Sequence, residues 1–197
     1  HAMSRRQRQM CIRDSFFVVG HDWGGPTAYA LAAAHPDAVT KLVILDVTVP
    51  GCGGDFSEGG RRWHHQFHST LDLPEALIHG REKVYLGWFY STFAYVPNAI
   101  TEVDINEYVR TYSQAGAMRA GFSYYRELPK DIEENLENIK RLKLPMPVLA
   151  IGGGVSYPHG RGRGEQTQDS LRRVANNVEG RVFDLSLIHI SEPTRQH

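Results

Sequence analysis

The sequence has little cysteine, no excess of charge of either sign and no long apolar run. Only Cys11 and Cys52 are cysteines among its 197 residues, so a framework of several disulfides is excluded. Lys and Arg together number 22, as do Asp and Glu, so the formal charges balance. No stretch is long and apolar enough for a membrane-spanning helix. These absences exclude a disulfide-stapled scaffold and a membrane-spanning protein.

Both ends of the chain match a translated DNA-library adapter. Residues 10–14 (Met-Cys-Ile-Arg-Asp) are encoded by AGATGTGTATAAGAGACAG read from its third base, and residues 185–190 (Leu-Ser-Leu-Ile-His-Ile) by its reverse complement. We therefore expect residues 1–15 and 185–197 to be adapter-derived, and we exclude them from fold prediction. Cys52 is then left without an intramolecular partner. The Arg-rich start is then no nucleic-acid-binding arm, because it belongs to the adapter, and the remaining insert is mildly acidic.

The most informative stretch is Gly20-His21-Asp22-Trp23-Gly24-Gly25. It follows an apolar run at 16–19 and precedes an Ala-rich segment at 26–34, which predicts a strand, a sharp turn and a helix. This context is typical of a nucleophile elbow, where a Cβ near the central residue would collide with the flanking strand and helix. A carboxylate at the centre, here Asp22, attacks a saturated carbon and forms an alkyl-enzyme ester that water then cleaves. The alternative is that Asp22 merely caps the helix.

The rest of the pattern predicts an α/β protein: a partial parallel sheet with an inserted helical cap. A helix at 24–35 and a near-continuous apolar strand at 41–46 complete a β-α-β unit. Further strands are expected from Pro147 and from Arg181, with a helix at 167–175 between them. We assign residues 16–50 and 145–184 to the core and 51–144 to the cap. The cap is expected to contain helices at 74–79, 81–93, 102–114, 118–127 and 130–140, with aromatic side chains mostly building its own core.

Together these features resemble the α/β-hydrolases of the epoxide hydrolase and haloalkane dehalogenase group. The likeness runs over residues 16–184. The cap segments Trp63-His64 and 122–126 (Phe-Ser-Tyr-Tyr-Arg) are similar to those of bacterial epoxide hydrolases that open the ring with a His/Tyr pair. The resemblance implies that Asp22 attacks a ring carbon while His64 and Tyr125 donate hydrogen bonds to the epoxide oxygen. Such donors are needed because an alkoxide is a poor leaving group unless its developing charge is stabilised.

The resemblance also implies parts that act in the second half of the reaction. Asp46, at the end of the strand before the cap, takes one of the family's positions for the acid that orients the base histidine. The backbone N–H of Trp23 would form half of the oxyanion hole. The base histidine itself is expected just beyond Asp184, where the adapter begins, and His189 is not assigned to this role. We therefore expect the chain as given to be inactive.

Each assignment has an alternative that involves no catalysis. His64 lies in a cluster with His65 and His68 that would also suit a solvated cap surface or, by spacing alone, a metal site. Tyr125 could instead be one more aromatic side chain that packs in the cap core. Asp46 could instead be an ordinary Asp that closes the loop after a strand.

The expected partner is a small-molecule epoxide or alkyl halide, with no cofactor, nucleic acid or membrane. The sequence leaves the oligomeric state open. It gives no localisation beyond favouring the cytoplasm. The competing functions are a haloalkane dehalogenase, in which the Trp23 indole would hold the departing halide, and a non-catalytic assembly fragment. A fluoroacetate-type enzyme fits less well because Trp23 replaces its arginine, and Asp22 disfavours a serine esterase.

Overall fold

The computed structural model describes residues 15–53, 56–57, 59–60, 62–93, 100–154 and 162–184. The expected adapter segments therefore lie outside the described residues except for Ser15, and so does His189. Within the described ranges, every helix is too short or too polar to cross a bilayer.

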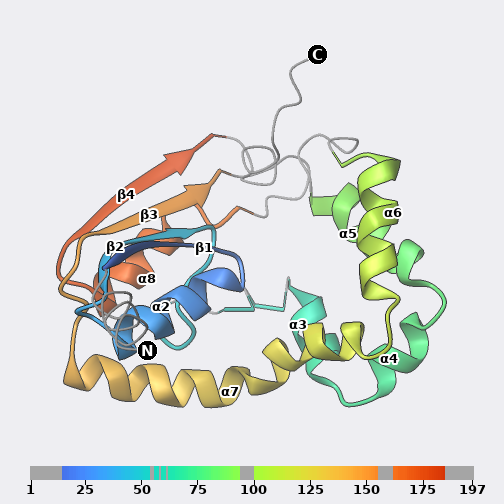
Figure 1. Cartoon of the computed structure of the whole chain (residues 1–197), viewed down its shortest axis with the longest axis horizontal. Helices are drawn as coiled ribbons and strands as arrows, with labels where there is room; N and C mark the ends of the chain where they lie inside the picture. The colour runs from blue at the N-terminus through green and yellow to red at the C-terminus, as the bar shows by residue number, and fades with distance from the viewer. Residues whose placement is uncertain are drawn as a thin grey trace, which may run out of the picture.

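Four parallel strands form one sheet in the order in which they occur along the chain (Figure 1). They are β1 (Phe16–His21), β2 (Val39–Leu45), β3 (Val148–Gly153) and β4 (Val178–Phe183). The predicted parallel sheet is thus confirmed. The expected start of the last strand at Arg181 is wrong, because β4 begins at Val178, opposite Val148 of β3. Its first residues alternate in exposure, as an edge strand does, so an apolar run does not mark its beginning.

The strand order explains why one face of the sheet carries the helices. Right-handed crossovers that always step in the same direction place every connecting helix on the same face. Helices α2 (Gly24–Ala34) and α8 (Gln166–Val174) both lie on this face (Figure 1). The buried core forms between them and the sheet from Ala28, Tyr29, Ala32, Val39, Leu42, Ile44, Val148, Ala150, Leu171 and Val174, among others.

The remaining helices form the region above the carboxyl ends of the strands. They are α3 (Trp63–Ser69), α4 (Leu73–Ile78), α5 (Glu82–Phe93), α6 (Glu102–Tyr112) and α7 (Ala117–Arg141). The expected helices near 74–79, 81–93 and 102–114 are present to within two residues, whereas α3 was not predicted. The aromatic core expected for the cap is only partly formed, because α5 and α6 contain no buried residue. A ring contact joins these two helices, between Tyr90 and Tyr108 with centroids 5.2 Å apart.

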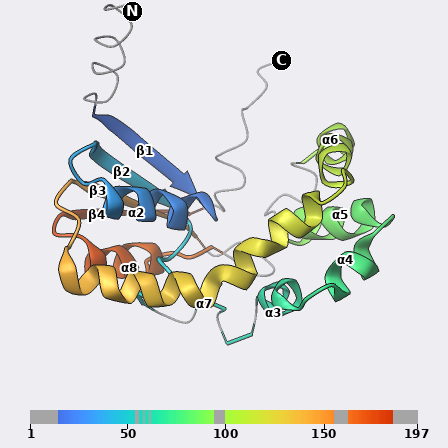
Figure 2. The same cartoon turned by 60° about the horizontal axis from the view of Figure 1, so that its bottom comes forward.

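Helix α7 joins the cap region to the sheet. We predicted two helices here, at 118–127 and 130–140, but α7 is continuous with Pro129 inside it. Proline removes one backbone hydrogen bond and bends a helix rather than ending it when both halves are held by other contacts. The side chain of Asn135 donates to the carbonyl of Pro50 at 3.0 Å, and Ile139 packs on the sheet core. Figure 2 shows α7 bending between its cap half and its sheet half.

The outer side of β1 is an exposed apolar edge. Among the described residues β1 pairs only with β2, and Phe17 and Val19 are 69% and 66% exposed. Unpaired apolar strands are templates for association.

We expect the chain to self-associate as its concentration rises, and the Val19→Lys variant to do so much less. Val103→Lys is the matched control, because Val103 is equally exposed but lies on helix α6. Sedimentation velocity over a concentration series measures both. A chain that stays monomeric and melts sharply would contradict this expectation.

Candidate active site

The turn between β1 and α2 has the geometry of a nucleophile elbow. Asp22 adopts a backbone φ of 49°, in the left-handed region that few residues other than glycine occupy. A Cβ on Gly20 would overlap the carbonyl of Gly24, and one on Gly25 would overlap a methyl of Val47. The collision predicted for these glycines is therefore confirmed at Gly20 and Gly25, although not at Gly24, which has open space around it.

The capping alternative for Asp22 does not fit this turn. The residue in the N-cap position of α2 is Trp23, and no side chain caps the helix. The carboxylate of Asp22 instead accepts the backbone N–H of Trp23 at 2.7 Å. Asp22 itself is exposed at the carboxyl end of β1, so its side chain can be reached from the space below the cap.

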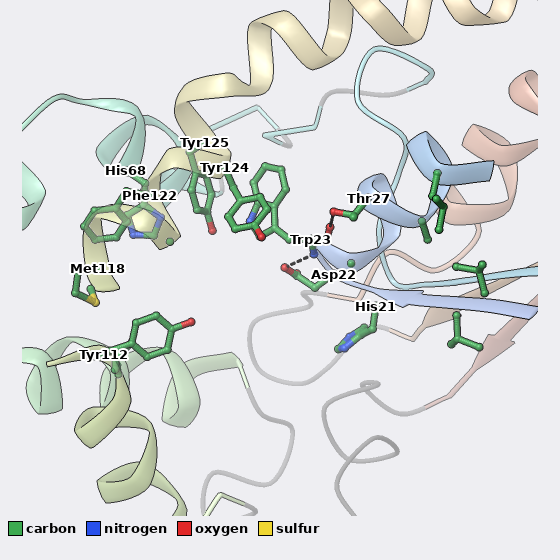
Figure 3. A pocket seen from close by; sticks show the side chains of 17 residues that line it. His21, Asp22, Trp23, Thr27, His68, Tyr112, Met118, Phe122, Tyr124 and Tyr125 are labelled. Atoms are coloured by element: carbon green, nitrogen blue, oxygen red, sulfur yellow. Dashed lines mark hydrogen bonds between the residues drawn. The ribbon is translucent and has the colours of Figure 1, made fainter. Parts of the chain in front are cut away.

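Asp22 and Tyr125 line two neighbouring cavities. The smaller, of about 250 Å³, is also lined by His64 and Asp46. The larger, of about 710 Å³, is mostly apolar and is also lined by His68. Figure 3 shows the carboxylate of Asp22 and the hydroxyl of Tyr125 turned toward the same space in the larger cavity. The structure therefore brings Asp22, His64, Tyr125 and Asp46 together around one small cavity.

Tyr125 is held against the elbow by Trp23. Their rings lie edge to face with centroids 4.9 Å apart. Burial raises the pKa of Tyr125 to about 12, a hydrogen bond with the Trp23 side chain opposes this rise, and the charge of Asp22 adds to it. The phenol is therefore protonated at neutral pH and able to donate a hydrogen bond into the site.

His64 faces Tyr125 from helix α3. The ring centroids of these two residues are 5.9 Å apart, and His64 is buried together with His65 and His68. A solvated surface is thus the wrong interpretation of the three histidines. Among the described residues no group of three His, Cys, Asp or Glu side chains is placed to hold a metal ion.

Asp46 lies at the end of β2 with a backbone φ of 51°. Its Oδ1 accepts the backbone N–H groups of Gly153 at 3.0 Å and Arg163 at 2.7 Å. Burial raises the pKa of Asp46, and these two hydrogen bonds act in the opposite direction. Among the described residues, no histidine donates to this carboxylate. Asp46 therefore binds the glycine-rich segment at 162–164 to the end of β3 in this structure.

Two residues of the larger cavity, Tyr112 and His68, are not assigned to the site by the sequence analysis. Tyr112, at the end of α6, is one of the cap aromatics expected to pack in the cap's own core, yet it is 39% exposed and its hydroxyl points toward Asp22 in Figure 3. No sequence signal could have found it, because only the packing of α6 near α7 brings it there. The sequence does contain a signal for His68. It follows His64 by one helical turn and therefore lies on the same face of α3.

A parallel sheet whose elbow presents a carboxylate to a cavity beneath inserted helices defines an α/β-hydrolase. The family model described as the alpha/beta hydrolase fold matches residues 2–153, and the chain belongs to this family. Within it the chain is epoxide hydrolase-like. It is 36% identical over 177 residues to the soluble epoxide hydrolase of Corynebacterium sp. (strain C12), covering 85% of this chain and 58% of that enzyme.

Other relatives and solved structures agree. Epoxide hydrolase 1 of Caenorhabditis elegans is 28% identical over 153 residues, which are 71% of this chain and 36% of that protein. The crystal structure of Cfl2 from Burkholderia cenocepacia matches with a TM-score of 0.76 and 32% identity over 92% of this chain and 62% of that one. Epoxide hydrolase CorEH matches with a TM-score of 0.76 and 33% identity over 91% and 63%. The chain thus spans less than two thirds of the length of each of these proteins.

Proposed function

We propose that the chain carries the ring-opening half of an epoxide hydrolase site. Asp22 attacks a ring carbon, the carbon–oxygen bond breaks, and the ring oxygen receives hydrogen bonds from His64 and Tyr125 as it gains charge. The observation that carries this proposal is the small cavity that Asp22, His64 and Tyr125 line together at the end of a strained strand-to-helix turn. The similarity to several epoxide hydrolases supports it.

The second half of the reaction is the hydrolysis of the alkyl-enzyme ester to a diol. It needs a base that activates water and donors that stabilise the tetrahedral intermediate. Asp46 is the proposed orienting acid, and the Trp23 N–H is a proposed oxyanion donor. Among the described residues the partners of Asp46 are backbone groups rather than a histidine. We therefore infer that this chain forms the ester and does not release it. The division into a core at 16–50 and 145–184 and a cap at 51–144 is part of the same proposal.

Replacing Tyr125 with Phe should slow the esterification of Asp22 by about a hundredfold or more, because the ring oxygen loses one donor while its charge develops. The rate is measured by intact mass after mixing the protein with an excess of a styrene-oxide-like epoxide. Tyr108→Phe, on helix α6, is the control and should react like the unmodified chain. An unchanged rate in Tyr125→Phe would assign Tyr125 to packing alone.

Haloalkane dehalogenation is the second candidate, and it rests on Trp23. A free indole N–H beside the nucleophile would suit a departing halide. Here the Trp23 ring packs edge to face on Tyr125, with centroids 4.9 Å apart, which favours a role in orienting the phenol. Release of one equivalent of halide from a 1-haloalkane, with no labelling by an epoxide, would make dehalogenation the activity.

A further inference from the structure

His68 contacts both proposed donors. Its ring centroid is 4.4 Å from that of Tyr125, edge to face, and 5.6 Å from that of His64. The side chain is only 6% exposed, and it lines the larger cavity next to Asp22. His68 is thus in contact with Tyr125, whose ring also packs on Trp23.

Two other side chains hold the ring of His68 in place. Its Nε2 shares a hydrogen bond with the hydroxyl of Tyr85 on helix α5, and its ring stacks on Phe122 with centroids 4.4 Å apart. Burial, together with the positive charges of His65 and Arg126, lowers the pKa of His68 to about 4, while the negative charge of Glu75 acts in the opposite direction. The ring is therefore neutral near pH 7, with one nitrogen as donor and the other as acceptor. A hydrogen bond to one ring nitrogen fixes both the tautomer and the orientation of such a ring.

We propose that His68, fixed by Tyr85, is a positioning residue that holds the Tyr125 hydroxyl in place for ring opening. This inference rests on the proposed function of Asp22 and Tyr125. Positioning matters because His64 and Tyr125 come from different helices, and a misplacement of about 1 Å at a reacting group costs about a hundredfold in rate.

A second set of contacts docks the helices independently of His68. Arg126 of α7 donates to both carboxylate oxygens of Glu75 at 2.8 and 3.0 Å, and to the carbonyl of Thr70 at 2.8 Å. Loss of the Tyr85 hydroxyl therefore leaves α7 attached to α3 and α4. Replacing Tyr85 with Phe also keeps its ring, so only the hydrogen bond to His68 is removed.

The test combines two readouts on the Tyr85→Phe variant. The first is the ¹⁹F resonance of 3-fluorotyrosine introduced at position 125, which reports the orientation of that ring. The second is the rate at which the epoxide probe labels Asp22. We expect the resonance to shift or broaden and labelling to slow by about tenfold or more, with the concentration dependence of labelling unchanged. The control is Tyr90→Phe, because Tyr90 is on the same helix and contacts Tyr108 instead.

His68→Phe provides the second variant, since it keeps an aromatic ring and loses both nitrogens. If Tyr85 and His68 act as one unit, Tyr85→Phe and His68→Phe should slow the labelling of Asp22 to a similar extent. The double variant should then be labelled no more slowly than either single variant. An unchanged resonance in Tyr85→Phe overturns the inference, as does additive slowing in the double variant. If the unmodified chain takes up no label at Asp22, the proposed function fails, and the ¹⁹F comparison alone still decides whether His68 positions Tyr125.

Discussion

Incubation of the chain with a styrene-oxide-like epoxide should add the mass of one probe molecule, and the Asp22→Asn variant should add none. The amide of Asn is not a nucleophile for a ring carbon, so its loss of labelling should be complete. Peptide mapping should place the adduct on Asp22, the exposed residue with a backbone φ of 49° at the elbow. Asp37→Asn is the control for unspecific esterification, because Asp37 is also exposed but lies after helix α2.

The same experiment separates one turnover from many. The adduct should persist, because within the described part of the chain the carboxylate of Asp46 is bound by backbone N–H groups of Gly153 and Arg163. Diol that accumulates beyond one equivalent per chain would contradict this expectation. In that case some residue of the chain activates water, and the inference that the ester is not released would be wrong.

Gly20→Ala should destabilise the fold strongly, whereas Gly24→Ala should not. The new Cβ at Gly20 would overlap the backbone carbonyl of Gly24, which cannot rotate away, and would also come within 2.9 Å of the Ala28 Cβ. Overpacking of this kind costs about 1–3 kcal/mol. At Gly24 no atom lies within 4 Å of the added Cβ, and alanine favours a helix over glycine by about 1 kcal/mol.

Urea denaturation followed by far-ultraviolet circular dichroism measures this difference. The midpoint of Gly20→Ala should fall well below that of the unmodified chain, and the midpoint of Gly24→Ala should stay level or rise. Equal midpoints for the two variants would mean that β1 and α2 do not approach each other as closely as the elbow requires.

The comparison of these two glycines also indicates how far the sequence could predict the elbow. Glycines flanking Asp22 between an apolar run and an Ala-rich segment predict the turn, because only a close approach of strand and helix requires so many residues without a Cβ. The sequence does not distinguish Gly24, which has space, from Gly25, which contacts Val47. That difference depends on where β2 lies.

Helix α7 is the clearest case in which local signals failed. Pro129 predicts a break, since a proline has no N–H to donate and its ring crowds the preceding turn. The helix continues because Arg126 on one side and Asn135 on the other are held by Glu75 and Pro50, which are distant in sequence. Contacts of this kind can outweigh the loss of one backbone hydrogen bond, and no local pattern reports them.

By itself the sequence determined the parallel α/β architecture, the elbow and its carboxylate, because apolar periodicity and glycine placement are local consequences of backbone sterics. Only the tertiary structure brought His64, Tyr125 and Asp46 around one cavity with Asp22, added His68, and bound Asp46 to the backbone of Arg163. The physical reason is that these residues come from separate helices and strands. Their distances are set by how the elements pack, and packing is a property of the whole fold.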